Sequence, residues 1–447
     1  MSLDWIASPG GALHGEARVP GDKSISHRAL MLAAISDGTS RITGFLEGED
    51  TRATAAILQQ LGVRIDTPAN GERIVHGVGL HGLRGSDAAL DCGNAGTGMR
   101  LLCGLLAGQR FDSVLIGDAS LSRRPMGRVI EPLQQMGARI EASAVGCAPI
   151  RINSIDRLQS IDIKTDIASA QLKSAILLGG LYADGTTTVH EPHATRDYTE
   201  RMLASFGYPI VFSPGIAALQ GGHRLRAIDI AVPADFSSAA FFIVAASVIP
   251  GSDLRLRAVG MNPRRTGLLS VLRAMGAEII EEDIIQQEIV LADAREHGEP
   301  LADLHVRSAP LHGIDVPAGL VADMIDEFPI LFAAAALADG VTRISGAAEL
   351  RVKESDRIAC MVAGLRALGV CVDETPDGAV IHGIGTTGKL RAGTVDSHGD
   401  HRIAMSFAVA AQRAHGEVRI SDCANVATSF PGFVQLATDC GLGLREA

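Results

Sequence analysis

Two kinds of helix alternate along this chain, and a glycine follows each of them. Six segments are short, rich in alanine and apolar at nearly every position, from HRALMLAAISDG near the start to HRIAMSFAVAAQRAHG near the end. A helix that is apolar on every face belongs in the interior of a domain. We therefore predict six buried helices, which end at Gly38, Gly108, Gly185, Gly251, Gly340 and Gly416.

An amphipathic helix follows each buried one. Segments such as ILQQLGVRI and VLRAMGAEI place a hydrophobic residue and a glycine before a strand-like stretch. A glycine directly after a helix can adopt the left-handed conformation that ends it. The pattern predicts such glycines at Gly62, Gly137, Gly207, Gly276, Gly369 and Gly441. Six copies of one pattern predict an α/β protein built from internal repeats, with the β-rich stretches on the outside.

Polar residues occupy the starts of the six buried helices. The positions fourteen residues before the closing glycines are Ser24, Asn94, Gln171, Ser237, Asp326 and Arg402. Ser, Asn and Asp are favoured helix N-caps, which explains some of these positions without any function. A helix start also carries free N–H groups and partial positive charge, which suit phosphate and carboxylate groups. If the six starts face one cleft, the repeat itself forms an anion-binding site.

Composition narrows the class of protein. The chain has 447 residues, of which 47% are hydrophobic and 20% are charged, as in a globular protein with an ample core. The net charge of −11 argues against a nucleic acid or an anionic membrane as a partner. The seven cysteines have no metal-binding spacing. With no signal sequence and no apolar run of roughly 18 residues, we expect a cytoplasmic protein.

The first half of the chain contains several cationic and glycine-rich motifs. They are PGDKSISHR with Lys23, Ser24 and Arg28; GNAGTGMR with Asn94 and Gly96; SRRPM with Arg124; SAQ with Ser169, Ala170 and Gln171; and TRD with Arg196. Neither a P-loop nor a Gly-x-Gly-x-x-Gly fingerprint is among them. Each motif alone is typical of exposed surface charge, although an arginine fixed beside proline can hold a carboxylate bidentately.

The second half contains carboxylates among further cations. DEFP places Asp326 and Glu327 at the mouth of an apolar helix, where they act either as caps or as a general base. RVKESDR carries Lys353, Glu354 and Arg357, and DHRIAM carries Arg402. Charges this dense usually form a solvated helix face.

Taken together, these motifs resemble the 5-enolpyruvylshikimate-3-phosphate synthases, a family of enolpyruvyl transferases. The motifs follow one another in order from PGDKSISHR to ATSFP, so the resemblance covers essentially the whole chain. It implies a two-domain, inside-out α/β barrel of six βαβαββ-type repeats, three per domain, around buried helices. The implied domains are 21–236 and 1–20 plus 237–447. They close over an active site in the cleft between them, in a monomer.

The resemblance also implies the reaction. The enolpyruvyl group of phosphoenolpyruvate moves to the 5-hydroxyl of shikimate 3-phosphate through a tetrahedral intermediate, with release of phosphate, in chorismate and aromatic amino-acid biosynthesis. No metal or cofactor is expected. Asp326 accepts the hydroxyl proton, and both Lys23 and Glu354 are candidates for protonating the methylene carbon.

The implied binding residues form two sets. Those for shikimate 3-phosphate are Lys23, Ser24, Arg28, Ser169, Ala170, Gln171, Arg196, Asp326 and Lys353. Those for phosphoenolpyruvate are Lys23, Asn94, Gly96, Arg124, Gln171, Arg357 and Arg402.

Three positions depart from the better-studied branch of the family. Ala170 replaces a second serine, Thr428 stands where many members carry a lysine, and Arg196 lies in a Thr-Arg-Asp sequence that replaces a Ser/Tyr pattern. These variants resemble members that tolerate the inhibitor glyphosate, but Gly96 is retained where tolerance often accompanies alanine, so sensitivity stays open.

Two alternative functions have different signatures. A UDP-N-acetylglucosamine enolpyruvyl transferase typically carries a loop cysteine and a Lys-Asn pair, whereas this chain has Arg123-Arg124 and Lys23-Ser24. A non-catalytic anion-binding repeat protein needs no acid or base such as Asp326 and Glu354.

Overall fold

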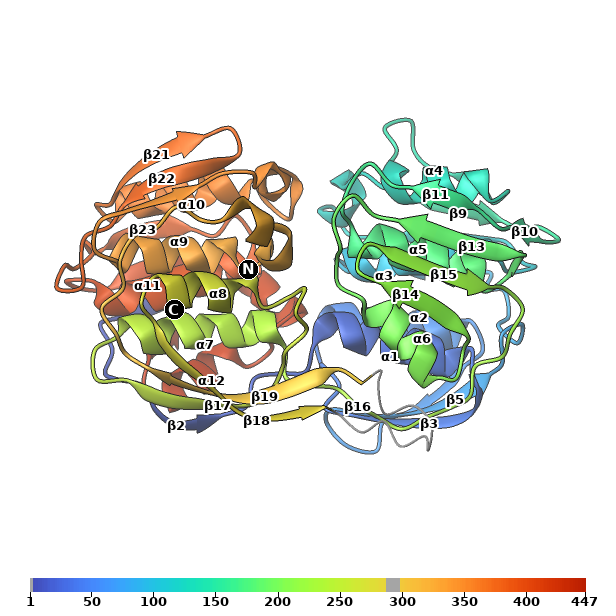
Figure 1. Cartoon of the computed structure of the whole chain (residues 1–447), viewed down its shortest axis with the longest axis horizontal. Helices are drawn as coiled ribbons and strands as arrows, with labels where there is room; N and C mark the ends of the chain where they lie inside the picture. The colour runs from blue at the N-terminus through green and yellow to red at the C-terminus, as the bar shows by residue number, and fades with distance from the viewer. Residues whose placement is uncertain (1–2, 287–297) are drawn as a thin grey trace. The chain divides into compact units, whose positions relative to one another are not determined.

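The computed structural model of this chain describes residues 3–286 and 298–447. They divide into two compact units (Figure 1). The terminal unit contains Met1–Pro20, Pro233–Ile285 and Pro300–Ala447, and the inserted unit contains Gly21–Val232 with the described residues of Gln286–Glu299. Each unit has its own hydrophobic core.

The inserted unit holds three four-stranded mixed sheets, each with one buried and one amphipathic helix. The first has the order β16-β3-β5-β4 (Ile230–Ala231, Asp37–Thr43, Glu72–Val78, Arg64–Asp66), with α1 (Lys23–Ala34) and α2 (Glu49–Gln60). The second is β6-β7-β9-β8 (Leu90–Asp91, Ser113–Ile116, Ile150–Asn153, Arg139–Glu141), with α3 (Gly96–Ala107) and α4 (Gly127–Gln135). The third is β11-β13-β15-β14 (Asp162–Lys164, Thr186–His190, Ile216–Gln220, Ile210–Ser213), with α5 (Ala170–Gly180) and α6 (Tyr198–Ser205). Two short strands, β10 (Leu158–Gln159) and β12 (Ala183–Asp184), pair separately.

The terminal unit repeats this arrangement. One sheet is β2-β17-β19-β18 (His14–Ala17, Asp253–Gly260, Pro300–Arg307, Glu278–Gln286), with α7 (Phe236–Val248) and α8 (Gly267–Ala274). The next is β20-β22-β21 (Val341–Ile344, Gly378–His382, Cys371–Thr375), with α9 (Phe328–Leu337) and α10 (Arg357–Ala367). The last is β23-β24-β1-β25 (Gly393–Asp396, Val418–Ser421, Trp5–Ser8, Gly443–Glu446), with α11 (His401–Ala410) and α12 (Phe433–Asp439).

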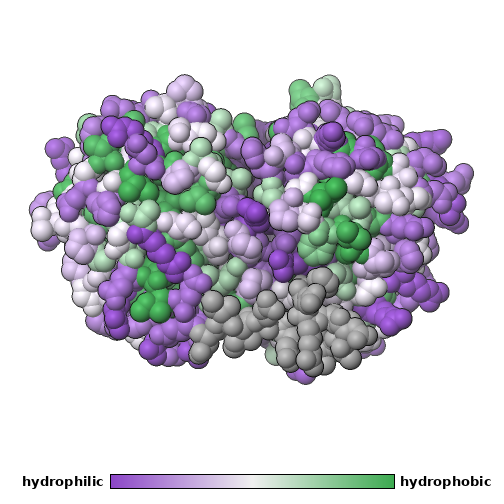
Figure 2. All heavy atoms as spheres, viewed as in Figure 1, coloured by the Kyte–Doolittle hydropathy of each residue, from purple (hydrophilic) through white to green (hydrophobic). Residues whose placement is uncertain are grey.

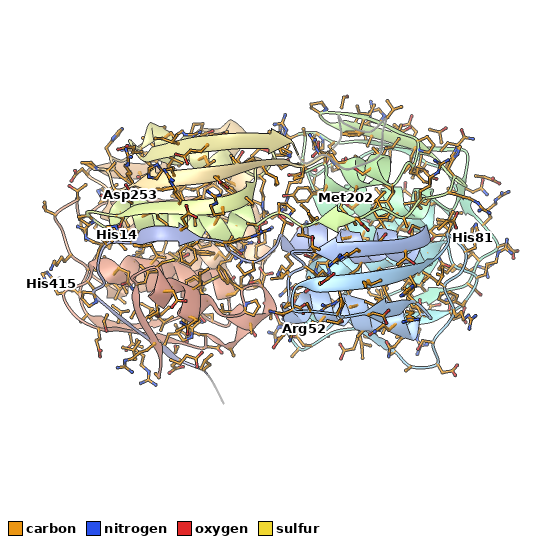
Figure 3. All side chains as sticks on the ribbon, turned by 90° about the horizontal axis from the view of Figure 1, so that it is seen from below. His14, Arg52, His81, Met202, Asp253 and His415 are labelled. Atoms are coloured by element: carbon orange, nitrogen blue, oxygen red, sulfur yellow. The ribbon has the colours of Figure 1, made fainter. Side chains whose placement is uncertain are left out.

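Every four-stranded sheet has one parallel edge strand, and every other pairing whose direction the structure describes is antiparallel. In the terminal unit, β2 runs parallel to β17, so that His14 pairs with Asp253, and Figure 3 shows these two residues on neighbouring strands. In the last sheet, β1 from the start of the chain fills the place between β24 and β25. These small mixed sheets confirm the predicted α/β class.

The six apolar segments form interior helices, as predicted. Every residue of α7 and α9 is buried, as is every residue of α11. The predicted ends are wrong for five of the six, because only α3 ends directly before its glycine, Gly108. The other five helices stop earlier and a turn or strand intervenes, so that Gly38, for example, lies within β3. Polar residues cover most of the face seen in Figure 2, with apolar side chains in small separate groups.

The amphipathic helices end as predicted. Each of the six glycines is the second residue after the last helical one, and all have φ between 75° and 108°.

At the starts of the buried helices, the predicted N-cap positions are wrong by one or two residues. At four of the buried helices, the N-cap side chain accepts a backbone N–H of the first turn; these caps are Asp22, Ser169, Asp235 and Asp400. Among the described helices, none is long and apolar enough to cross a membrane.

Candidate functional site

The start of α1 gathers several predicted residues of the inserted unit. Asp22 caps the helix by accepting from the Ile25 N–H at 2.8 Å. Lys23, the first helical residue, places its Nζ 2.9 Å from Oδ2 of Asp50. Its side chain is 20% exposed, so the ammonium group can exchange this carboxylate for a bound anion.

Arg28 lies one turn further along α1 and is buried. Its Nε donates to the Thr199 hydroxyl and one terminal nitrogen donates to the Ser174 hydroxyl, each at 2.7 Å. The other terminal nitrogen donates to the Ser24 carbonyl at 3.0 Å. One guanidinium therefore joins α1 to α5 and α6, in a fixed orientation.

Arg196 brings a second positive charge close to that of Arg28. Burial, and then the charge of Arg196, lower the pKa of Arg28 to about 10, against the opposing effect of Glu200. Two like charges held this close favour a doubly charged anion, which screens their repulsion. Phosphate is such an anion.

The start of α3 is shaped by glycine. A Cβ atom at Gly96 would lie 3.0 Å from a terminal nitrogen of Arg124 and 3.2 Å from one of Arg100. Arg124 is held by Asn94, whose side-chain oxygen accepts from it at 2.8 Å, and Asn94 in turn donates to Asp118 at 2.7 Å. The missing side chain lets two guanidinium groups approach the helix start.

The starts of α3 and α5 are joined by one amide. Gln171 accepts from Arg100 at 3.0 Å and donates to the Thr97 hydroxyl at 2.8 Å. Ser169 caps α5 by accepting from the Leu172 N–H at 3.4 Å. Most of the predicted residues of the first half thus lie at or beside the starts of α1, α3 and α5, whereas Arg124 precedes α4 and Arg196 precedes α6.

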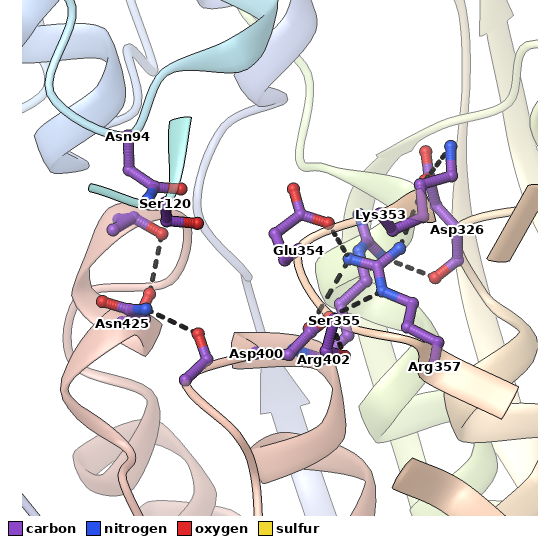
Figure 4. A network of polar contacts seen from close by, with 12 residues as sticks. Asn94, Ser120, Asp326, Lys353, Glu354, Ser355, Arg357, Asp400, Arg402 and Asn425 are labelled. Carbon is purple, nitrogen blue, oxygen red and sulfur yellow. Dashed lines mark hydrogen bonds and ion pairs between the residues drawn. The ribbon is translucent and has the colours of Figure 1, made fainter. Parts of the chain in front are cut away.

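The terminal unit builds its polar network around Asp326 (Figure 4). One carboxylate oxygen accepts from Arg265 at 3.1 Å. The other lies 3.7 Å from Nζ of Lys353 and 3.7 Å from a terminal nitrogen of Arg357. The Asp326 side chain keeps 17% of its surface exposed, so this carboxylate remains accessible to a ligand.

Arg357 is the most deeply buried cation of this network. Its Nε donates to Asp400 at 2.8 Å and a terminal nitrogen donates to Glu354 at 2.6 Å. Burial by itself lowers the pKa of Arg357, but the charges of Asp400 and Glu354 outweigh it and raise the pKa above its usual value. The guanidinium therefore stays charged beneath the site.

Arg402 connects the starts of α7, α9 and α11. It donates to the Asp326 carbonyl at 2.8 Å and to the Ser237 hydroxyl at 3.3 Å, and it lies 3.5 Å from the buried Glu327 carboxylate. Three of the six polar helix starts of the repeat thus meet in this unit.

Sequence reasoning missed two arginines. Arg265 contacts Asp326 and also donates to Ser237, and Arg100 holds Gln171. A usable signal existed for Arg265, because NPRRTG also contains two adjacent arginines next to a proline, although there the proline precedes them and in SRRPM it follows. Thr428 turns inward, and its buried hydroxyl donates to the Asn425 carbonyl at 2.7 Å.

Within residues 3–286 and 298–447, no cluster of three or more His, Cys, Asp or Glu residues is arranged to hold a metal ion.

His27 makes folding of the inserted unit sensitive to pH. It is buried between Lys23 and Arg28 on α1, with Nδ1 2.8 Å from the Thr54 hydroxyl oxygen. Burial, and then the charges of Lys23 and Arg28, lower its pKa from 6.5 to about 3. Between these values the unfolded chain binds a proton that the folded chain does not, so stability falls as pH falls through this window.

We expect a His27→Gln variant to lose this dependence. Relative to the variant, the wild type should lose up to about 1.4 kcal/mol of stability for each pH unit below 6.5. Urea midpoints at pH 7 and pH 5 measure the difference. Equal shifts in the two proteins would show that His27 titrates normally.

A family model, a curated relative and solved structures agree on which proteins this chain resembles. A family model described as EPSP synthase (3-phosphoshikimate 1-carboxyvinyltransferase) matches residues 7–436. A 3-phosphoshikimate 1-carboxyvinyltransferase of Xanthomonas campestris pv. campestris is 65% identical over 440 residues, which cover 98% of each chain. A crystallised EPSP synthase from Acinetobacter baumannii is 48% identical, with a TM-score of 0.88 over all of both chains. The enolpyruvyl transferase NikO from Streptomyces tendae shares the fold, with a TM-score of 0.80 at 18% identity.

Proposed function

Since this chain belongs to the EPSP synthase family and is a 3-phosphoshikimate 1-carboxyvinyltransferase of the shikimate pathway, we propose that its two units each supply half of one active site. It transfers the enolpyruvyl group of phosphoenolpyruvate to shikimate 3-phosphate in aromatic amino-acid biosynthesis. The observation that carries the proposal is the Asp326 carboxylate, which is partly exposed and faces three cations.

Shikimate 3-phosphate binds mainly to the inserted unit. Arg28 and Arg196 hold its phosphate, and the proximity of their charges supports this assignment. The remaining ligands are Lys23, Ser24, Ser169, Ala170 and Gln171, with Asp326 and Lys353 from the terminal unit. Ala170 has no hydroxyl to offer, so Arg196 replaces a neutral hydrogen bond with a charge-assisted one.

Phosphoenolpyruvate is held by cations from both units. Lys23, Arg124, Arg357 and Arg402 neutralise its phosphate and carboxylate, while Asn94, Gly96 and Gln171 shape the pocket. In the structure these cations are paired with carboxylate or amide oxygens, such as Asp50 with Lys23 and Glu354 with Arg357. Binding therefore exchanges internal partners for substrate oxygens.

The chemistry requires three proton transfers, two in the addition and one in the elimination, and no electron transfer. Asp326 takes the proton of the 5-hydroxyl as its oxygen attacks the substituted carbon of the enolpyruvyl group. Lys23 or Glu354 donates a proton to the methylene carbon, which completes the tetrahedral intermediate. In the elimination, the side chain that protonated the carbon takes a proton back from the new methyl group as the bond to phosphate breaks, which releases phosphate and forms the enol ether. Positioning and fixed cations stabilise both transition states.

The two compact units support the finer architecture. We assign the inserted unit, predicted as residues 21–236, to a shikimate 3-phosphate domain and the terminal unit, predicted as residues 1–20 plus 237–447, to a second domain, in an inside-out α/β barrel with three βαβαββ-type repeats in each; the boundary lies between Val232 and Pro233, four residues before the predicted one. The strand order common to the four-stranded sheets supports the repeats. We further propose that the enzyme is a cytoplasmic monomer.

Phosphate release tests this function. We expect the purified protein to release phosphate from phosphoenolpyruvate only when shikimate 3-phosphate is present. Phosphate release with shikimate 3-phosphate omitted measures the background. No release with the pair, or equal release with UDP-N-acetylglucosamine, would overturn the proposal.

Gly96 offers a test of the phosphoenolpyruvate pocket. In Gly96→Ala, the new methyl group lies 3.0 Å from Arg124 and 3.2 Å from Arg100, so the guanidinium groups must shift. We expect KM for phosphoenolpyruvate to rise by about tenfold, equivalent to about 1.4 kcal/mol. KM for shikimate 3-phosphate should change little. Gly127→Ala is the matched control, because Gly127 also begins a helix but its Cβ meets only the end of Glu131, at 3.4 Å.

A further inference from the structure

A buried cluster of three charges lies behind the proposed phosphate site of the inserted unit. Nζ of Lys173, on α5, is 2.8 Å from a carboxylate oxygen of Glu191 and 2.8 Å from one of Glu200. The three side chains are only 4%, 2% and 2% exposed. A single carboxylate would neutralise the lysine, and a second buried one is costly to desolvate. Neutralising Lys173 therefore does not explain why the cluster contains a second carboxylate.

Glu191 does something that Glu200 does not. It directly follows β13, at the start of the loop that leads to α6. Its carboxylate accepts from both the hydroxyl and the backbone N–H of Thr195, the latter at 3.4 Å. Lys173 reaches the same residue from the other side, with Nζ 3.5 Å from the Thr195 carbonyl. Glu191 and Lys173 thus grip the backbone on both sides of Thr195, immediately before Arg196.

We propose that Glu191 is a positioning residue, which fixes Thr195 so that the Arg196 guanidinium is presented to the phosphate of shikimate 3-phosphate. This inference rests on the proposed function, in which Arg196 binds that phosphate. Arginine recognises phosphate through a planar fork, so its orientation matters as much as its charge. The loop between β13 and α6 has no regular structure to hold it, and the cluster supplies the missing constraint.

Electrostatics and positioning predict opposite effects for Glu191→Gln. Removing a carboxylate near the phosphate makes the site more positive, which by itself lowers KM for shikimate 3-phosphate. Loosening the loop raises this KM. We expect the loss of positioning to outweigh the change in charge, so that KM for shikimate 3-phosphate rises by about tenfold, because a charge-assisted fork is lost. KM for phosphoenolpyruvate and kcat should stay within about twofold.

Glu200→Gln is the matched control. Glu200 pairs with Lys173 at the same 2.8 Å and is equally buried, but its described contacts do not include Thr195. We expect its KM for shikimate 3-phosphate to be unchanged or lower. If both variants raise KM equally, the cluster acts through general stability, and the positioning role is wrong. Thr195→Val, which removes the hydroxyl and keeps the shape, should reproduce the direction of the Glu191→Gln effect.

A double-mutant cycle with Arg196→Gln separates this inference from the proposed function. If Glu191 acts through Arg196, Glu191→Gln should add less than about twofold to KM once Arg196 is gone. A full additive effect would overturn the positioning role. If Arg196→Gln alone leaves KM for shikimate 3-phosphate unchanged, the assignment of Arg196 to the phosphate fails, while the phosphate-release assay still reports the enzyme's activity.

Discussion

Replacing Asp326 by asparagine is expected to lower kcat by about 10²-fold to 10⁴-fold, which is the usual contribution of a general base. The amide keeps the size of the carboxylate but cannot accept the proton of the 5-hydroxyl. Since Arg265, Lys353 and Arg357 hold the side chain in place, the variant should still bind shikimate 3-phosphate, and both KM values should change far less than kcat. Steady-state phosphate release measures all three constants.

Asp323→Asn is a suitable control for this experiment. Asp323 lies three residues earlier, in a short 3₁₀ helix (Ala322–Met324), and pairs with Arg264 at 3.5 Å. Like Asp326 it is a carboxylate beside an arginine, although it is more deeply buried, and it has no role in the proposed chemistry. We expect its kcat to remain close to that of the wild type. Near-normal turnover in Asp326→Asn would remove Asp326 from the role of base.

Replacing Arg357 by methionine is expected to cost about 3–5 kcal/mol of stability, because the partner of a buried ion pair is left without a counter-charge. Arg357 is 2% exposed and Asp400 is fully buried, with Nε 2.8 Å from the carboxylate. The urea midpoint should fall accordingly. The double variant Arg357→Met/Asp400→Asn should regain part of the loss, because an amide needs no counter-charge. No recovery would show that packing, and not the buried charge, causes the effect.

Arg351→Met is the comparison for an exposed pair. Arg351 lies 2.7 Å from Asp356, close to the distance in the buried pair, but both side chains are more than a quarter exposed. Solvent screens such pairs, so little change in the urea midpoint is expected. A loss as large as that of Arg357→Met would contradict the importance of burial.

The buried pair of Arg357 and Asp400 also makes the stability of the protein depend on pH. Although burial alone raises the pKa of Asp400, the Arg357 guanidinium outweighs it and holds the pKa below its usual value. The stabilisation is therefore complete above the unfolded pKa of about 4 and is lost as pH falls towards the lower, folded value. In the Asp400→Asn variant, the acid limb of the stability profile should be shallower.

Much of the fold could be predicted from local sequence patterns. The six buried helices follow from segments that are apolar all round, and the six C′ glycines, such as Gly62 and Gly276, follow from the hydrophobic-Gly step. Both signals are local, because helix periodicity and the left-handed glycine depend on residues a few positions apart. The exact ends were less predictable. Gly38 closes the pattern but lies in β3, because strand pairing with β5 competes with the last turn of the helix.

The candidate site was predictable as a set of residues and not as a set of contacts. The motifs named Lys23, Arg124, Asp326 and Arg357, since charged residues at the mouths of apolar helices stand out in a sequence. They did not name Arg265, which reaches Asp326 across 61 positions of the chain. A charge that looks solvated in the sequence acquires its partner only when distant segments of the chain pack.

Local sequence patterns were enough to predict the repeat, its buried helices, the glycines that end the amphipathic ones, and the polar character of each helix start. The folded chain was needed to see which polar groups face one another: Arg28 with Ser174 and Thr199, Gln171 with Arg100, and Asp326 with Arg265. It also decided that the first strand, β1, completes the last sheet. The physical reason is that periodicity acts over one or two turns, whereas ion pairing and strand pairing depend on distances in space between residues far apart in the chain.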